Sequence, residues 1–247
     1  MGLKVEHLTG GYGSFPVLKD INFSIAEGEL VGLIGLNGAG KSTTIKHIIG
    51  LLQPMKGQCS IDGETLNNNK EAYRKKMGFI PESPSLYEEL TLKEHIEVTA
   101  MAYDISYDEA MRRAEPLLKL FRLDKKLEWF PTHFSKGMKQ KVMIVCAFLI
   151  QPSLYIIDEP FLGLDPIAID DLLQLMVKMK EAGASILMST HILATAETFC
   201  DRFIVLHEGE IIADGTLEQL QEQFSMPAAS LDEIYLSLTK RGQAHDE

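Results

Sequence analysis

One glycine-rich stretch, GLNGAGKS at residues 35–42, constrains the fold of this chain more than any other feature. It lies between an apolar run at residues 30–34, which predicts a buried strand, and a helix-like run at residues 43–49. Glycines let a backbone curl around an anion with its N–H groups pointing inward, and the positive end of the following helix dipole adds to the attraction. Lys41 is placed to reach outer phosphates and Ser42 to hold Mg²⁺. We therefore interpret residues 35–42 as a phosphate loop. The alternative, a glycine-rich turn that happens to contain a lysine, does not account for strand, loop and helix occurring in this order.

The overall composition excludes several classes of protein. With 247 residues, 45% of them hydrophobic, the chain can bury a sizeable core. Its 24 Lys+Arg against 35 Asp+Glu give a net charge of −11, which argues against sequence-independent nucleic-acid binding. No apolar run approaches the roughly 18 uncharged residues of a membrane span, so we expect an unexported chain outside the membrane.

The three cysteines are Cys59, Cys146 and Cys200, an odd number with no Cys-x-x-Cys spacing. This pattern favours neither a disulfide framework nor a zinc site. We expect three small buried side chains in a reducing cytosol.

The first part of the chain predicts antiparallel strands. Residues 3–8 and 17–25 alternate apolar with polar side chains around a glycine-rich turn that contains Tyr12. An aromatic ring on such a turn could stack on a flat ligand, or it could pack over the sheet edge. Residues 58–61 and 77–80 predict further strands.

Helix signals replace strand signals between Pro81 and Gln151. Thr91 with Glu94 and Ser106 with Glu109 both match the capping box, which predicts two helix starts. Another helix is predicted after Ser135. Two apolar stripes at helical spacing fit core positions; they comprise Ala110, Ala114, Leu117, Leu118 and Phe121, and Met138, Val142, Val145, Cys146 and Leu149. We interpret this segment as a helical lobe inserted into a sheet domain.

Charged residues follow two predicted parallel strands. The continuous apolar run at residues 154–157 ends in Asp158 and Glu159, and the strand at residues 185–189 is followed by His191. Ligands gather at the carboxyl ends of parallel strands, so these side chains would share one rim. From the residues alone, solvated acids and a structural histidine remain alternatives. A hairpin at residues 202–214 and two capped helices, from Thr216 and Ser230, complete the prediction. The last helix has an apolar face that could dock on the domain or on a second subunit.

Five motifs occur in one characteristic order: GLNGAGKS (35–42), SKGMKQ (135–140), IIDE (156–159), GLD (163–165) and STH (189–191). With these, the chain resembles the ATP-binding subunits of ABC transporters over nearly its full length. Through PES (81–83) and FSKGM (134–138) it most resembles exporter-type bacterial subunits of the EcsA group. The resemblance implies an α/β fold: a P-loop NTPase core with a mainly parallel, RecA-like sheet, an N-terminal antiparallel β subdomain and an inserted α-helical subdomain. The expected boundaries are 1–82 and 152–222 for the core with its antiparallel subdomain, 83–151 for the insert and 223–247 for a C-terminal helical extension.

The same resemblance assigns roles to individual residues. Tyr12 matches an aromatic residue that stacks on adenine, Glu159 a general base and His191 a switch histidine at the γ-phosphate. Asp165 matches a loop that communicates across a dimer. The implied ATP contacts are Tyr12, Val17, Asn37, Gly38, Ala39, Gly40, Lys41, Ser42 and Thr43 from one subunit, with Ser135, Gly137 and Met138 closing from the other. The implied Mg²⁺ ligands are Ser42, Glu82 and Asp158.

Three positions depart from the family pattern. Glu82 stands where glutamine is usual, Lys136 replaces the usual first glycine of residues 135–140, and Met138 replaces a glutamine. Our hypothesis is that Glu82 still contacts Mg²⁺ while Lys136 offsets part of the added negative charge.

The expected function is ATP binding and hydrolysis by a dimer that drives a separate membrane-spanning partner, in export. The subunit would be cytoplasmic and peripheral on the inner face of the membrane, with residues 82–87 docking on that partner. Two alternatives remain: a soluble ABC-type ATPase acting on nucleic acid or ribosomes, and a regulatory module with low turnover. The acidic charge speaks against the first, and the presence of Glu159 and His191 against the second.

Overall fold

The chain opens with an antiparallel sheet. The computed structural model describes residues 2–243, and its first 65 residues supply the four-stranded order β2-β1-β4-β5. The strands are β1 (Leu3–Tyr12), β2 (Phe15–Ile25), β4 (Lys56–Ile61) and β5 (Glu64–Thr65). All three pairings within this sheet are antiparallel, as the alternation of apolar and polar residues predicts.

The second sheet has six strands in the order β10-β9-β3-β8-β7-β6. They are β3 (Leu30–Ile34), β6 (Met77–Ile80), β7 (Leu154–Asp158), β8 (Ser185–Thr190), β9 (Arg202–His207) and β10 (Glu210–Gly215). All pairs are parallel except β9 with β10. Every residue of β3, β7 and β8 is buried, so their continuous apolar runs are explained by burial on both faces. The carboxyl ends of these three neighbouring strands therefore meet at one edge.

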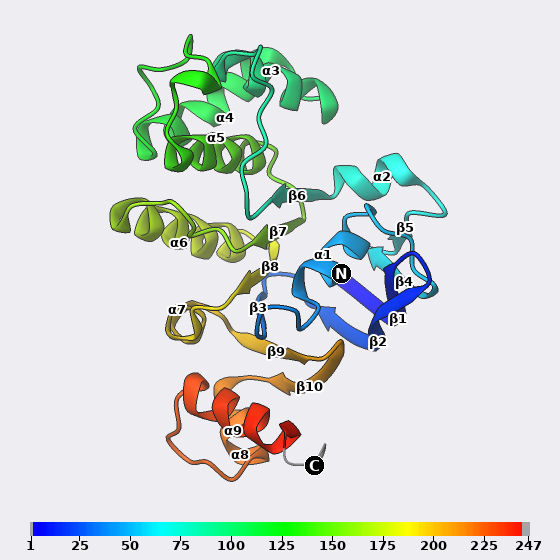
Figure 1. Ribbon diagram of the computed structural model, residues 1–247. Helices are drawn as coiled ribbons and strands as arrows, with labels where there is room; N and C mark the ends of the chain where they lie inside the picture. Colours follow the sequence, from blue (N-terminus) through cyan, green and yellow to red (C-terminus); the bar gives the residue numbers. More distant parts are fainter. Residues whose placement is uncertain (1, 244–247) are drawn as a thin grey trace.

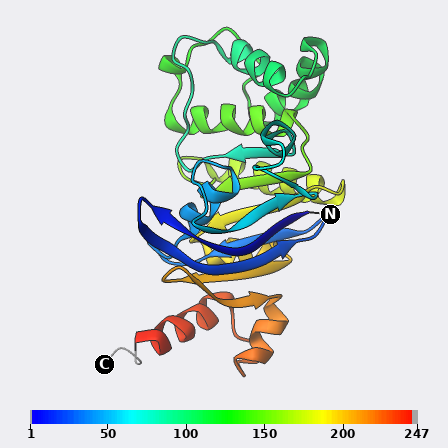
Figure 2. The same cartoon turned by 90° about the vertical axis from the view of Figure 1, so that its right-hand side faces the viewer.

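Helices lie on both sides of this sheet, and on one side the antiparallel sheet covers it as well (Figure 1). They are α1 (Lys41–Ile48), α2 (Lys70–Lys75), α3 (Leu92–Ala102), α4 (Tyr107–Leu120), α5 (Lys136–Leu149), α6 (Pro166–Glu181), α7 (Leu193–Phe199), α8 (Leu217–Gln223) and α9 (Leu231–Gln243). In both views α3, α4 and α5 form a group at one end of the molecule, and α8 and α9 lie at the opposite end beyond β10 (Figures 1 and 2).

The core is divided by the parallel sheet. Val31, Leu33 and Ile156 belong to the cluster between the two sheets, whereas Tyr155 and Ile157 belong to the cluster shared with the helical group. Successive side chains of β7 thus point to opposite faces of the sheet and pack in different cores. The expected α/β fold with an antiparallel sheet and an inserted group of helices is confirmed; the domain boundaries stay a prediction.

The helix starts are as predicted, with one error. Thr91 and Thr216 form complete capping boxes. Ser106 caps α4, because its hydroxyl accepts from the backbone N–H of Glu109. The second bond of the predicted capping box, from the Ser106 N–H to the Glu109 carboxylate, is not formed. That carboxylate accepts instead from Arg112 at 2.7 Å and from Arg113 at 2.6 Å, and these bonds lower its pKa to about 2. Two charged partners one turn along the helix outcompete a single backbone N–H.

The three cysteines are free thiols within the described residues. Cys59 is buried, and burial raises its pKa to about 12. Burial likewise raises the pKa of Cys146 to about 11. Thiols with such high pKa values carry little thiolate at neutral pH, so they are poor nucleophiles and metal ligands. None of the helices between residues 2 and 243 is both long and apolar enough to span a bilayer.

Candidate functional site

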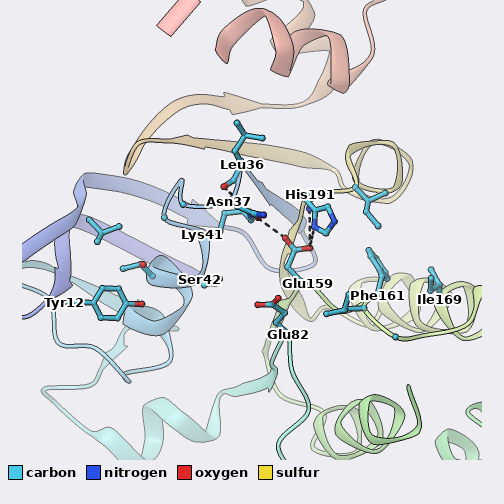
Figure 3. Close-up of a pocket in the computed structure, with 17 residues that line it drawn as sticks. Tyr12, Leu36, Asn37, Lys41, Ser42, Glu82, Glu159, Phe161, Ile169 and His191 are labelled. Carbon is cyan, nitrogen blue, oxygen red and sulfur yellow. Dashed lines mark hydrogen bonds and ion pairs between the residues drawn. The ribbon is translucent and has the colours of Figure 1, made fainter. Parts of the chain in front are cut away.

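A cavity of about 670 Å³ opens beyond the carboxyl ends of β3, β7 and β8 (Figure 3). Its lining brings together residues from the antiparallel sheet, the phosphate loop, the strand ends and the start of α6. The lining residues are Tyr12, Val17, Leu36, Asn37, Gly38, Gly40, Lys41, Ser42, Thr43, Glu82, Glu159, Phe161, Leu162, Gly163, Ile169, His191 and Ile192.

The phosphate loop has the backbone that an anion site needs. Gly38 and Gly40 have φ angles of 87° and 112°, in the region that favours glycine. The N-cap residue of α1 is Gly40, so no N-cap side chain accepts from the first N–H groups of this helix. Gly35 must also be glycine, because a Cβ there would lie 2.6 Å from the carbonyl oxygen of Leu206. The helix N-terminus thus faces the cavity with its backbone amides and the positive end of its dipole.

Lys41 is the buried cation of the site, with only 6% of its surface exposed. Its Nζ donates to the carbonyl oxygen of Gly35 at 2.8 Å and lies 3.7 Å from the Glu159 carboxylate. A buried ammonium group needs such partners, since leaving it unpaired costs several kcal/mol. These contacts hold the lysine over its own loop, where it can meet phosphate oxygens.

Glu159 lies between Lys41 and His191. Its backbone has a φ of 46°, unusual for a residue other than glycine, and its N–H donates to the Ser189 hydroxyl at 3.1 Å. Strained backbone of this kind persists where surrounding contacts enforce it, often at functional sites. The Glu159 carboxylate pairs with the His191 Nδ1 at 2.8 Å (Figure 3). A carboxylate held between a lysine and a histidine at the mouth of a phosphate cradle is suited to act as a base toward water.

Asp158 and Glu82 supply the other carboxylates. Asp158 is buried at the end of β7 and accepts a short hydrogen bond from the Ser189 hydroxyl, and it does not line the cavity. Glu82 is exposed and lines the cavity, as does Ser42. No group of three His, Cys, Asp or Glu within residues 2–243 could hold a metal ion by itself. These oxygen donors do fit Mg²⁺, which binds through one or two protein ligands together with phosphates and water.

Tyr12 forms the opposite wall of the cavity from His191 (Figure 3). Its ring is half exposed, and its hydroxyl accepts from Lys46 at 3.0 Å, which together with Thr43 lowers its pKa. Val17 lies on the neighbouring strand and also lines the cavity. An exposed ring beside an aliphatic residue suits the face of a flat heterocycle.

Five predicted site residues do not line this cavity: Ala39, Asp158, Ser135, Gly137 and Met138. Ser135 caps α5 by accepting from the Met138 N–H at 3.3 Å. Gly137 packs so closely on the cavity wall that a Cβ would lie 2.3 Å from the Gly163 carbonyl oxygen. The segment 135–140, which we call the signature segment, therefore lies behind the cavity rather than inside it.

Several residues of the site were missed from the sequence. Leu36, Phe161, Leu162, Ile169 and Ile192 line the cavity, and the Ser189 hydroxyl donates to the Asp158 carboxylate and accepts from the Glu159 N–H. Gln140 is buried and donates to the Pro81 carbonyl oxygen at 3.3 Å, next to Glu82. Lys141 pairs with Asp165 at 2.8 Å and lowers the pKa of that aspartate to about 2. Ser189 stands in the STH motif (189–191), which is the signal for it in the sequence, but no role was predicted for it.

Comparison with known proteins decides between the alternatives. A sequence model described as "ABC transporter" matches residues 18–162. The chain belongs to the ABC transporter family. The ABC-type transporter ATP-binding protein EcsA of Bacillus subtilis (strain 168) is 61% identical over 244 residues, which cover 99% of each chain. A solved structure of the ATP-binding subunit of an ABC transporter is 59% identical, with a TM-score of 0.94, covering 97% of this chain and 100% of its own.

A further solved structure is a dimeric ABC cassette in a post-hydrolysis state bound to ADP and Pi. It is 30% identical with a TM-score of 0.78, and the match covers 87% of this chain and 98% of that one. Together these likenesses confirm the P-loop NTPase fold and the prediction that this ABC protein is an ATP-binding, ATP-hydrolysing transporter subunit. They favour this function over the nucleic-acid and low-turnover alternatives.

Proposed function

We propose that this ABC subunit hydrolyses MgATP at two composite sites in a dimer and uses the cycle to drive a membrane-spanning partner in export. One observation carries the proposal: Lys41, Glu159 and His191 form a continuous chain of polar contacts at the mouth of the phosphate loop. Phosphoryl transfer needs little covalent help, so a site that fixes charges and a water can supply most of the catalysis.

The phosphates of ATP would lie in the phosphate loop. The free N–H groups at the start of α1 would donate to them, and Lys41 would exchange its bond to the Gly35 carbonyl for phosphate oxygens. Adenine would stack on the ring of Tyr12 beside Val17. The remaining contacts would come from Asn37, Gly38, Ala39, Gly40, Ser42 and Thr43.

Mg²⁺ would be held by Ser42 directly and by Glu82 and Asp158 directly or through water. When bound, the ion supplies neutralisation of the charge on the outer phosphates. The Ser189 hydroxyl, by donating to Asp158, keeps that carboxylate in place as an acceptor.

Glu159 would orient the attacking water and accept its proton. This role is supported by its contact with Lys41, beside which the outer phosphates would lie, and by the His191 contact, which would set the direction of the carboxylate. His191 would then donate toward the γ-phosphate. The His191 side chain is 64% exposed, whereas that of Glu159 is 13% exposed. The histidine would therefore lie on the open side of the cavity, where a second subunit could close the site.

The second subunit would complete the site with Ser135, Gly137 and Met138. These residues are not part of the cavity of their own chain, yet they stand at the start of a helix, where backbone N–H groups attract an anion. The dimeric relative bound to ADP and Pi supports the formation of a dimer. Asp165, which follows the cavity-lining Gly163, would pass the state of one site to the other.

A membrane partner would dock on residues 82–87, which places the subunit on the cytoplasmic face of the membrane. Tyr87 is 64% exposed, and its backbone N–H is held by the Nε2 of buried His95 at 3.0 Å. An exposed ring on a fixed backbone is a typical anchor of a protein interface. Export is supported by the resemblance of residues 81–83 and 134–138 to exporter-type subunits.

The test is purification of the tagged chain from membranes with its partner, followed by reconstitution. We expect an integral membrane protein in the complex, ATP hydrolysis coupled to transport, and substrate accumulation in ATP-fed inside-out vesicles. Replacing Leu86 and Tyr87 by alanine should lower transport while ATP affinity stays unchanged. Loss of ATP affinity in that variant, or purification without any membrane protein, would contradict the proposal.

A further inference from the structure

The C-terminal helix α9 packs against the roots of two segments of the ATP site. One face of α9, formed by Leu231, Ile234 and Tyr235, is at most 6% exposed. The same apolar cluster includes Ile34, the last residue of β3 before the phosphate loop, and Leu193 of α7. One helix near the end of the chain therefore packs on the base of the phosphate loop and on the helix after His191.

The contact with α7 is polar as well as apolar. The backbone N–H of Leu231, at the start of α9, donates to the Glu197 carboxylate of α7 at 2.7 Å. A carboxylate at a helix N-terminus satisfies a free donor and interacts favourably with the dipole. Since α7 begins at Leu193, two residues after His191, this bond fixes the helix that carries the His191 loop.

The contact with the phosphate loop involves Tyr235. Its side chain is 6% exposed and belongs to the same buried apolar cluster as Ile34, the residue before the phosphate loop. The loop continues into Leu36, which lines the cavity and whose carbonyl oxygen lies 3.5 Å from the Nζ of Lys41. In Figure 3 Leu36 lies on the side of the cavity toward the C-terminal helices. The ring of Tyr235 thus belongs to the packing at the root of the loop that carries Lys41.

We propose that α9 is a positioning element of the ATP site. Tyr235 supports the phosphate loop through the apolar cluster that contains Ile34, and the bond between Leu231 and Glu197 fixes α7 and hence His191. This inference rests on the proposed roles of the phosphate loop and His191. It gives the C-terminal helix a part in nucleotide binding and turnover, although none of its residues lines the cavity.

The two contacts predict separable kinetic effects. In the full-length chain purified with its membrane partner, Tyr235→Ala removes the ring from the cluster that contains Ile34. We expect KM for ATP to rise about threefold to tenfold as the loop loses this packing, with kcat within about twofold of wild type. Glu197→Ala should instead lower kcat by about threefold or more and leave KM within about twofold.

Leu236→Ala provides the matched control, because this side chain is on the same helix but 54% exposed. It should change neither constant. Thermal unfolding of all variants shows whether each is folded at the assay temperature. Loss of folded protein alone would lower kcat in both variants and leave KM unchanged. That outcome, or wild-type constants in Tyr235→Ala and Glu197→Ala, would overturn the proposal. If instead the proposed function is wrong, the wild-type protein would not hydrolyse ATP, or Glu159→Gln would hydrolyse it at the wild-type rate.

Discussion

The N-termini of two helices in this subunit have the same first residue but different surroundings. Both α1 and α5 start at a lysine, Lys41 and Lys136 respectively. Gly40 caps α1 without a side chain, and Lys41 is buried at the cavity. Ser135 caps α5 with its own hydroxyl, and Lys136 is exposed to solvent. The first helix offers open N–H groups to a ligand of its own chain, whereas the second presents its terminus outward.

The outward helix is nevertheless tied to the cavity of its own chain. Gly137 packs on the Gly163 carbonyl, Lys141 pairs with Asp165, and Gln140 donates to the Pro81 carbonyl. Movement of the cavity wall on binding ATP would therefore be passed to the N-terminus of α5, which in the proposed dimer faces the partner. The comparison shows two unlike helix starts in one chain, which the proposed function assigns to two halves of a site, and the predictions below test each half.

The largest effect is expected at the α1 half. Lys41→Ala removes the cation that meets the outer phosphates, so ATPase activity should fall by at least about 100-fold. Lys70→Ala is the matched control, because Lys70 is the first residue of α2 and is exposed. The measurement is steady-state ATPase with nucleotide binding. Equal, small effects of the two substitutions would remove the distinction between α1 and an ordinary helix start.

A smaller loss is expected at the α5 half. Ser135→Ala and Ser106→Ala each remove one serine N-cap with the same kind of bond, 3.3 Å and 3.4 Å respectively. Both should lower the free energy of unfolding by about 1 kcal/mol. Only Ser135→Ala should lower kcat, by about tenfold, because in the proposed dimer α5 would face ATP and α4 would not. Equal kcat values in the two variants would show that α5 acts only structurally.

The departures from the family pattern give a finer test. Glu82 lines the cavity, whereas Lys136 would face the ATP of the partner subunit. If the two charges compensate at the phosphates, Glu82→Gln and Lys136→Gly should show a coupling of about 1 kcal/mol in a double-mutant cycle on ATPase rate. Strictly additive effects would mean that Lys136 is only solvated.

The smallest effect concerns the bond between α5 and the cavity wall. Lys141 lowers the pKa of Asp165 to about 2 from 3.8, so the pair stabilises the fold above pH 4 and loses this contribution as pH falls toward 2. Since the aspartate is 54% exposed, we expect less than about 1 kcal/mol. Urea unfolding should show Asp165→Asn less stable than wild type at pH 6, with most of this difference lost near pH 2. A difference of the same size at pH 2 would contradict an electrostatic origin.

Sequence patterns were sufficient where local order determines structure. The run of strand, glycine-rich loop and helix predicted the placement of Lys41, and the buried strand ending in two acids predicted that Glu159 would share its rim with His191. Sequence patterns did not predict the helices α2 and α7, because both are short and lack an extended apolar stripe. A lone capping pattern was also misleading at Ser106, because the nearby arginines compete for Glu109.

Long-range contacts were beyond prediction from local patterns. Gln140 meets Pro81 across 59 residues, and Ser189 meets Asp158 across 31. The apolar face of α9 was visible in the sequence, with docking on the domain or on a second subunit both open. Its burial with Ile34 shows that this face is used within the chain.

The most direct test of the two-half site is Glu159→Gln. This substitution keeps the shape of the side chain and removes its charge, so ATP should still bind at Lys41 while water activation is lost. We expect turnover to fall by at least about 100-fold and an ATP-dependent dimer to become stable in light scattering. Turnover near that of wild type, or a protein that binds ATP and remains monomeric, would contradict the account.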